Sequence, residues 1–526
     1  MNASNSIAIV GAGPGGLAAA VLLAASGLKV KVYEAAPEVG GRTSRVRCGA
    51  FSFDRGPTFF MMPYVLEEVF AAAGKRLGDY ADLKRLDPMY RLVLGRPGDA
   101  PLTVDATQDL AEMARRLGTI NAADGRAFGR FIEDNRYKLR HSESILRNQM
   151  RSPLDLFGPA TLIDTLRVGP VLNPHLSVHE LLSRYFDDPY VRLSVSFQSK
   201  YLGMSPFECP SLFTILPFIE YEYGIWHPIG GCHALMHALA KLATELGAEI
   251  VTGTPVEGIE FEGTRATGVR VRGESHRHAS VVVNADATWA IKHLVPAAVR
   301  AKAGAGYADA AVDAKRYSCS TFMLYLGVEG AVDLPHHTIY VSEAYKQNLE
   351  DICTNGCLSG DPSTYVCNPS RIDPTLAPAG DSSVYVLVPT PNCSADVDWA
   401  VEAPTLRETA LDQIRDRMGV DLRGRIKEEV VLTPADWRGA NINFGATFNL
   451  SHNLGQMLHK RPQNRLKGFD GLYLVGGGTH PGSGLPTIFL SAQISSRLVC
   501  EAMDVPFAGA TEAVRKVGKS RQMVGT

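Results

Sequence analysis

The sequence of 526 residues predicts an α/β fold made of two discontinuous parts. An apolar strand, a glycine-rich loop, a helix and a second strand follow one another within residues 7–34, and a second strand–glycine–helix junction lies at 472–487. Two long stretches of different character, 76–224 and 291–420, lie between these glycine-rich segments. Because a chain of this length is too long for one hydrophobic core, we expect at least two domains.

The first segment has the pattern of a dinucleotide-binding loop. An apolar strand at 7–10 runs into GAGPGG, and a helix-prone run follows at 17–25. In this pattern the glycines permit a tight turn, a close approach of the backbone to a pyrophosphate, and close packing of helix on strand. The start of the helix then faces the phosphates. We expect a Rossmann-like domain with Gly11, Ala12, Gly13, Gly15 and Gly16 at the cofactor.

An acidic residue and a second glycine pair follow this unit. Glu34 lies 18 residues beyond Gly16, where it is expected to accept hydrogen bonds from a ribose and to disfavour NADP. Gly41 and Arg42 end a GGR sequence, and Arg42 can donate two parallel hydrogen bonds to a pyrophosphate or to carboxylates. Both halves together resemble the flavoprotein superfamily that includes amine oxidases, protoporphyrinogen oxidases, carotenoid desaturases and Rab GDP-dissociation inhibitors. The resemblance implies FAD as the cofactor.

Two further blocks narrow the resemblance. FDRGPT at 53–58, followed by MMP at 61–63, is similar to the bacterial carotenoid desaturases of the phytoene and dehydrosqualene type. SPFECPSLFTILPFIE at 205–220 is similar to the same family, and it reads as the wall of a hydrophobic substrate channel or as simple core. The resemblance covers the chain from residue 7 to about residue 502. It implies that Gly56 and Pro57 lie at the cofactor and that the backbone at Val256 contacts the adenine.

The second glycine-rich junction is near the C-terminus. A strand at 472–475 is followed by GGGTHPGSGLP, and a helix is expected from about residue 487. The resemblance implies that this block covers the far end of the flavin, where a helix start stabilises the negative charge of the reduced ring. His480 is the candidate catalytic residue, although a histidine before proline is commonly a packing element. The other residues expected at the cofactor here are Gly477, Gly478, Gly484 and Pro486.

The domain organisation follows from these segments. The FAD-binding domain is expected to combine 1–75, 225–290 and 421–505. The inserted stretches, 76–224 and 291–420, are expected to form a substrate-binding, membrane-facing domain of mixed sheet and helices. Residues 506–526 have little apolar periodicity and are predicted to be a disordered tail. Residues 269–271 and 280–283 read as a hairpin pair.

Bulk composition excludes several classes of function. The formal net charge is −2 and 21% of residues are charged, so nothing points to a nucleic-acid partner. Nine scattered cysteines suit a reducing compartment. The spacing of Cys353, Cys357 and Cys367 matches no common zinc site, and His233 and His237 lack a third ligand, so no metal is expected.

Membrane contact is expected to be peripheral. The apolar run at 7–25 is interrupted by Gly-Pro-Gly-Gly, and no other stretch is long enough to span a bilayer. Basic residues accompany an apolar stretch at 151–176, which suits either an anionic membrane surface or a solvated helical face. The expected location is the cytoplasm, at the inner face of the cell membrane.

The resemblance implies a specific reaction. The substrate is expected to be a hydrophobic polyene precursor, either dehydrosqualene (4,4'-diapophytoene, C30) or phytoene (C40), and the motif spacing favours the C30 compound. A hydride passes from a CH₂–CH₂ unit to the flavin, a proton is lost, and oxygen or a quinone takes the electrons. Alternatives of the same fold are a carotenoid isomerase, a terminal carotenoid oxidase, an amine oxidase and a non-catalytic isoprenoid-binding escort protein. The oligomeric state has no signal in the sequence.

Overall fold

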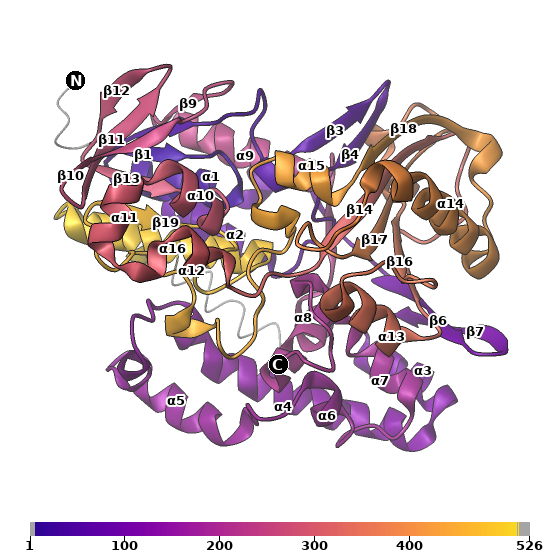
Figure 1. The fold of residues 1–526 in the computed structure, drawn as a ribbon. Coiled ribbons are helices and arrows are strands. Elements are labelled where there is room, and N and C mark those ends of the chain that lie inside the picture. Colours follow the sequence, from indigo (N-terminus) through magenta and orange to yellow (C-terminus); the bar gives the residue numbers. More distant parts are fainter. Residues whose placement is uncertain (1–5, 513, 515–526) are drawn as a thin grey trace.

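The computed structural model describes residues 6–512 and residue 514, and it contains two large β-sheets. Figure 1 shows a sheet with its covering helices at the upper left, a larger sheet at the right, and a group of helices below both. The mixture of a parallel sheet, a mixed sheet and helices confirms the predicted α/β fold class with an α+β insert.

The first sheet has five strands, all parallel, in the order β19-β13-β1-β2-β9. Strands β1 and β13 at its centre are almost entirely apolar and buried, as expected for a parallel sheet that is covered on both faces. Helix α1 packs between α9 and α16 on one face. The strands are β1 (Ser6–Val10), β2 (Lys29–Tyr33), β9 (Glu249–Val251), β13 (Ser280–Val283) and β19 (Leu472–Leu474), and the helices are α1 (Pro14–Ala25), α9 (Cys232–Glu245) and α16 (Leu485–Ala502).

A three-stranded antiparallel layer, β10 (Gly258–Glu262), β11 (Arg265–Val271) and β12 (Glu274–Arg277), lies beside this sheet. The expected pairing of 269–271 with 280–283 is wrong, because β11 pairs with β12 instead. Arg272 and Gly273 both have positive φ, which suits the two-residue turn of a tight hairpin. All four residues of β13 are buried, as expected for a strand inside a parallel sheet.

The second sheet has seven strands in the order β18-β14-β17-β16-β15-β6-β7, antiparallel except for the β15–β6 pair. Residues 426–432, expected in the FAD-binding domain, form its edge strand β18. Three consecutive residues of β18, Lys427, Glu428 and Glu429, are charged, and none of its residues is fully buried, as suits an edge strand; pairing with β14 holds it there. The strands are β6 (Tyr90–Arg96), β7 (Asp99–Ala106), β14 (Ser320–Val328), β15 (His337–Val341), β16 (Thr364–Cys367), β17 (Ser382–Thr390) and β18 (Ile426–Leu432).

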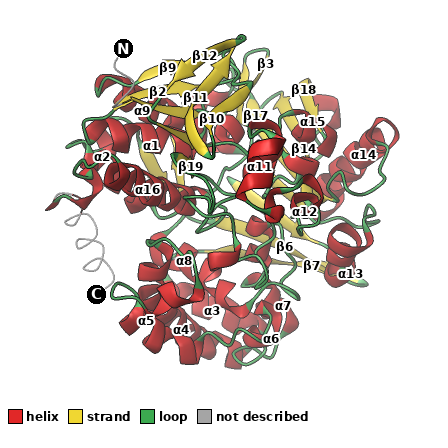
Figure 2. Ribbon diagram, turned by 60° about the vertical axis from the view of Figure 1, so that its left-hand side comes forward, coloured by secondary structure: helices red, strands yellow, loops and turns green. Residues whose placement is uncertain are grey.

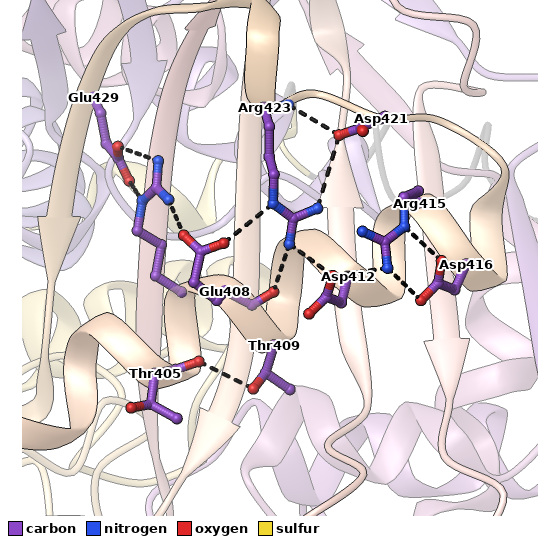
Figure 3. Close-up of polar contacts among 10 residues, drawn as sticks. Thr405, Glu408, Thr409, Asp412, Arg415, Asp416, Asp421, Arg423 and Glu429 are labelled. Carbon is purple, nitrogen blue, oxygen red and sulfur yellow. Dashed lines mark hydrogen bonds and ion pairs between the residues drawn. The ribbon is translucent and has the colours of Figure 1, made fainter.

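Helix α14 (Trp399–Met418) covers the outer face of this sheet. Its apolar side, including Leu406 and Ile414, joins the core formed by β14 and β17. Figure 3 shows the ionic contacts at its surface, among them those of Glu429 on β18 and of Arg423 with Asp412 at 2.7 Å. Exposed ion pairs of this kind contribute less than about 1 kcal/mol each, so the buried apolar side holds the helix in place.

The region below the sheets is helical (Figure 2). Helices α3 and α4 begin where the side chains of Asp109 and Asn121 accept hydrogen bonds from the first backbone N–H groups. The helices are α3 (Leu110–Ile120), α4 (Ala122–Leu146), α5 (Leu162–Val168), α6 (Val178–Leu182), α7 (Pro189–Ser194) and α8 (Ile215–Tyr223). No helix among residues 6–512 is both long enough and apolar enough to cross a bilayer.

Short elements join the two sheets. Some of them pack with a different sheet from the one that the expected domain boundaries assign. Residues 291–312, expected in the insert, contribute Ile291, Leu294 and Val312 to the core that contains β1 and β13. These apolar side chains therefore belong with the parallel sheet. The remaining elements are β3 (Arg45–Cys48), β4 (Phe51–Asp54), α2 (Pro63–Ala72), β5 (Leu83–Arg85), β8 (Trp226–Pro228), α10 (Ala287–Leu294), α11 (Ala297–Ala303), α12 (Asp309–Asp313), α13 (Tyr345–Glu350) and α15 (Pro434–Gly439).

The predicted disordered tail is wrong for its first residues. Phe507 packs against the main core, and the backbone N–H of Ala508 donates to Ser26 Oγ at 3.0 Å. An apolar side chain with a place in the core and a hydrogen-bonded backbone order this segment. Residue 513 and residues 515–526, the rest of that prediction, lie outside the described residues.

Candidate cofactor and active site

The glycine loop between β1 and α1 leaves no room for side chains. Gly11 has a φ of +97°, and a Cβ there would lie 2.4 Å from the carbonyl oxygen of Asn284. A Cβ on Gly16 would lie 2.1 Å from the carbonyl oxygen of Gly11. Helix α1 begins at Pro14 with no side-chain cap among the described residues, so the N–H groups of its first turn remain available to an anion.

Asn284 is the partner of this loop, and no motif in the sequence marks it as a site residue. It directly follows β13, and its Nδ2 donates to the carbonyl oxygen of Gly11 at 3.2 Å. Cβ atoms placed on Gly13 and Gly15 would lie 2.9 and 2.7 Å from its side-chain amide. The signal that could have identified it is a polar residue at the carboxyl end of a fully buried parallel strand.

Glu34 is buried at the end of β2, where it fixes the loop. Its carboxylate accepts hydrogen bonds from the backbone N–H groups of Ala12, at 2.6 Å, and Ala36, at 2.8 Å. Each oxygen keeps a lone pair that a ribose hydroxyl can use. The N–H of Thr254 donates to the carbonyl of Glu34 at 2.8 Å, which brings the half-buried Val256 to the same end of the site.

Arg42 connects the two halves of the chain. Its Nη1 donates to the carbonyl oxygen of Thr447 at 2.9 Å, and its Nη2 donates to Asp286 at 3.2 Å. The sequence predicted phosphates or carboxylates as partners for this guanidinium, and a carboxylate is one partner found. Gly41 lies against Gly13, where an added Cβ would approach within 3.3 Å of its Cα.

The Gly56-Pro57 segment lies against Arg42. A Cβ on Gly56 would lie 2.6 Å from the carbonyl oxygen of Arg42. The phenol of Tyr385, on β17, donates to the carbonyl oxygen of Gly56 at 2.9 Å. The two glycine segments predicted to face the cofactor are therefore adjacent, and the seven-stranded sheet supports them from behind.

The C-terminal glycine-rich block, residues 476–486, packs against the N-terminal loop, residues 11–16. A Cβ on Gly15 would lie 3.0 Å from Val475 and 3.2 Å from Ile488, on either side of the block. Gly477 and Gly478 are packed too closely for side chains, with Asn449 and Ala287 at 2.8 and 3.1 Å from added Cβ atoms. Helix α16 begins after Gly484, which has a φ of +110°; Pro486 lies in its first turn, and no described side chain caps it.

Arg461 supplies an unmatched positive charge beneath this block. It is 2% exposed, and its Nη2 donates to the carbonyl oxygen of Gly477 at 2.7 Å. Its Nε and Nη1 have no hydrogen-bond partner among the described residues. Burial lowers the pKa of Arg461 to about 10, against the favourable charge of Asp286. Buried donors are nearly always hydrogen-bonded, so Nε and Nη1 of Arg461 indicate an acceptor at this position. No sequence motif identifies Arg461 as a site residue.

These residues fit an anionic dinucleotide such as FAD. The glycine loops leave space at the backbone, the starts of α1 and α16 present N–H groups, and Arg461 has donors without acceptors. Pyrophosphate oxygens and the carbonyl groups of a flavin are acceptors that suit such donors.

His480 is fully buried between this block and the end of α4. Its Nε2 lies 3.0 Å from the carbonyl oxygen of Asn148, to which it donates, and its Nδ1 has no partner among the described residues. Burial lowers the pKa of His480 to about 4, so the ring is neutral near pH 7. His480 therefore packs against Asn148, and the lone pair of its Nδ1 has no partner among the described residues.

An aromatic cluster follows the Gly56-Pro57 segment. Phe59 stacks on His337 with ring centroids 4.1 Å apart, and it contacts Tyr201 at 5.2 Å. Behind it, the phenol of Tyr90 donates to Glu220 at 2.9 Å. Burial raises the pKa of the Glu220 carboxyl to about 7, although hydrogen bonds from neighbouring groups oppose the shift. The predicted apolar wall thus contains one buried acid.

Comparison with known proteins places the chain in a family. Residues 14–500 match the family of flavin-containing amine oxidoreductases. The chain is 41% identical to a 4,4'-diapophytoene desaturase (4,4'-diapolycopene-forming) of Methylomonas sp, over 95% of this chain and 96% of that protein. It is 39% identical to an all-trans-zeta-carotene desaturase of Myxococcus xanthus, over 96% and 95%.

A solved structure of an oxidoreductase from Methanosarcina mazei matches with a TM-score of 0.64 at 17% identity, covering 94% of this chain and all of that one. At this identity the match supports the fold alone. The sequence matches extend over nearly the whole chain. The chain therefore belongs to the family of flavin-containing amine oxidoreductases and, within it, to the carotenoid desaturases.

Proposed function

We propose that this protein is an FAD-dependent desaturase of acyclic carotenoid precursors and that its substrate is the C30 compound 4,4'-diapophytoene. The observation that carries the proposal is the 41% identity, over nearly the full length of both chains, to a protein named for that substrate. The C40 compound phytoene is the competing substrate, because a phytoene desaturase of Pseudescherichia vulneris is 34% identical over 94% of this chain.

FAD is the cofactor of this family, and when bound it accepts a hydride from a CH₂–CH₂ unit beside the polyene. The protein's own residues bind and orient it. The Gly11–Gly16 loop and the start of α1 bind the pyrophosphate, and Glu34 holds the ribose end. Arg461 and the start of α16 stabilise negative charge at the far end.

Residues on the substrate side of the site exclude water and accept the proton that the substrate loses. The cluster around Phe59 offers rings to a polyene and keeps water away from the reacting carbon. The free Nδ1 of the neutral His480 is the proton acceptor in this proposal. Oxygen or a quinone would accept the two electrons that the cofactor takes up.

The helical region is proposed to rest on the inner face of the cell membrane, from the cytoplasmic side. Large apolar side chains are exposed before and along α5, with Leu154 at 77% and Ile163 and Leu166 at 63% each. A surface cavity of about 670 Å³, lined in part by Pro170 and Val171 just after α5, has five basic residues against two acidic ones. An apolar face next to positive charge suits an anionic lipid surface. The charged residues of the cavity are Arg130, Glu133, Asp134, Arg136, Lys138, Arg140 and Arg184.

Expression in cells that make 4,4'-diapophytoene or phytoene tests the activity, with the pigments identified by mass and absorption. Conjugated C30 products support the proposal, C40 products alone would move it to phytoene, and rearranged or oxygenated products would favour an isomerase or oxidase. Co-sedimentation with phosphatidylglycerol vesicles tests the membrane surface separately. The double variant Ile163→Ser/Leu166→Ser should lose vesicle binding, whereas Val401→Ser, which changes an equally exposed residue on α14, should not.

A further inference from the structure

A second group of chemically active side chains lies where two central strands of the seven-stranded sheet, β15 and β16, meet the segment that follows Gly56-Pro57. His337 begins β15 and Cys367 ends β16, and the antiparallel register places them directly opposite each other. His336 precedes His337, and their ring centroids are 4.4 Å apart. Cys367 is distant from both histidines in the sequence, and only the pairing of β15 with β16 brings them together.

The donor atoms of these three residues converge. One ring nitrogen of each histidine and the Sγ of Cys367 all lie within 4.8 Å of one another. The exposed fractions are 5% for His336, 0% for His337 and 1% for Cys367. Among the described residues, neither ring nitrogen of His336 nor the Nε2 of His337 has a hydrogen-bond partner. Buried polar atoms without partners are rare and point to a missing water or ion.

A hydrogen-bonded chain orients one of the two histidines, His337. The Nδ1 of His337 lies 2.7 Å from the phenol of Tyr365, which lies 2.6 Å from Thr58 Oγ1. When Tyr365 donates to Thr58, it accepts from Nδ1–H of His337, and the lone pair of Nε2, which has no partner among the described residues, stays available to a ligand. His227, whose ring centroid is 4.7 Å from that of His336, is itself held by Asp373 at 2.9 Å. Histidine ligands are commonly fixed by such outer partners.

We propose that His336, His337 and Cys367 bind one zinc-class divalent ion, with a water molecule completing the tetrahedron. Two imidazoles and a thiolate are a donor set that zinc accepts. Ligand distances of about 2.0–2.3 Å would bring the donor atoms to roughly 3.5 Å from one another, a contraction that rotation of the rings can supply. Binding forms a metal–sulfur bond and releases the thiol proton of Cys367 to solvent.

The position of the site indicates a structural role. Phe59 stacks on His337, and Thr58 connects through Tyr365 to the same ring. An ion here would fasten β15 and β16 to the segment that follows Gly56-Pro57, and so would hold the aromatic cluster in place. The ion would be separate from the electron transfer of the flavin.

The test uses the FAD-loaded protein, stripped with a chelator and titrated with Zn²⁺ alone. We expect one equivalent to remain after gel filtration, measured by elemental mass spectrometry, and a higher apparent melting temperature with the ion than without it. Co²⁺ in its place should give d–d bands at longer wavelength than the flavin absorption, together with a thiolate charge-transfer band. These readouts do not depend on catalytic activity.

Two variants and a matched control decide the assignment. His336→Gln and Cys367→Ser should lose the equivalent of zinc and the cobalt bands while keeping bound FAD and the circular dichroism of the wild type. Cys357→Ser, an exposed cysteine, should keep both. Wild-type protein that retains no zinc above the level of His336→Gln, or cobalt bands that survive in Cys367→Ser, would overturn the proposal.

Discussion

Replacing Glu220 with glutamine should remove a penalty on folding that grows with pH. Glu220 is fully buried on α8, where its carboxylate accepts hydrogen bonds from Tyr90 at 2.9 Å and from the side-chain amide of Gln198 at 3.0 Å. Burial raises its pKa from 4.5 to about 7. A raised carboxyl pKa means that the folded state binds the proton more tightly than the unfolded chain. The penalty is therefore absent below pH 4.5 and complete above pH 7.

The size of the effect follows from the two pKa values. A pKa difference of about 2.5, at about 1.4 kcal/mol for each unit, makes the ionised carboxylate cost about 3 kcal/mol at pH 8. About 2 kcal/mol of this cost develops between pH 5.5 and pH 8. With an unfolding entropy of about 1 kcal/mol per kelvin for a chain of this length, the apparent melting temperature should respond by roughly 2 °C.

Thermal melts of the FAD-loaded protein at pH 5.5 and pH 8, followed by circular dichroism, measure this difference. Glu220→Gln keeps the shape of the side chain, so its melting temperature relative to wild type should be higher at pH 8 than at pH 5.5 by about that amount. Glu274→Gln, an exposed acid on β12, is the control and should show no such dependence. A Glu220→Gln difference that is equal at both pH values would refute the reasoning.

Other predictions concern the cofactor site. Gly16→Ala should abolish FAD retention, because its Cβ would lie 2.1 Å from the carbonyl oxygen of Gly11, whereas Gly129→Ala, with open space around it, should keep the flavin absorbance of the wild type. Arg461→Gln should weaken FAD binding about 10- to 100-fold in reconstitution titrations, as expected for loss of charge-assisted hydrogen bonds, and unchanged affinity would separate Arg461 from the flavin. His480→Gln should keep FAD but lower turnover at least about 100-fold, and wild-type turnover should show no His480 titration between pH 5.5 and 8, since its pKa is about 4. Full activity in that variant would leave His480 with its packing contact to Asn148 alone.

The sequence predicted the features that depend on local order along the chain. A strand, a glycine loop and a helix are adjacent in sequence, so residues 7–34 specify their own geometry and the α/β class follows from them. The same holds for the junction at 472–487. Both segments fold as expected because the backbone conformations that glycine permits are set within a few residues.

Features that depend on pairing between distant segments were not predictable in this way. Residues 280–283 are equally consistent with a hairpin or a central parallel strand until their neighbours are known. Residues 426–432 combine charged and β-branched residues as edge strands do, and only contact with β14 shows which sheet they join. Asn284 donates a hydrogen bond to Gly11, and Arg461 donates one to Gly477. No rule of sequence spacing predicts either contact.

The cluster of His336, His337 and Cys367 illustrates the same limit. In the sequence, Cys367 lies near Cys353 and Cys357, and the spacing of these three cysteines matches no metal site. In the structure, the register of β15 and β16 places Cys367 next to His336 and His337. The alternation of side chains across a sheet, and not the spacing along the chain, determines which donors meet.

The most direct test of the proposed function is anaerobic mixing of the FAD-loaded protein with 4,4'-diapophytoene in phosphatidylglycerol vesicles, followed by its absorption spectrum. We predict that the flavin absorption bleaches and that a polyene with a longer conjugated system appears, with one double bond formed for each flavin reduced. A flavin that stays oxidised with 4,4'-diapophytoene and with phytoene, but bleaches with a primary amine, would contradict carotenoid desaturation and assign the site to amine oxidation.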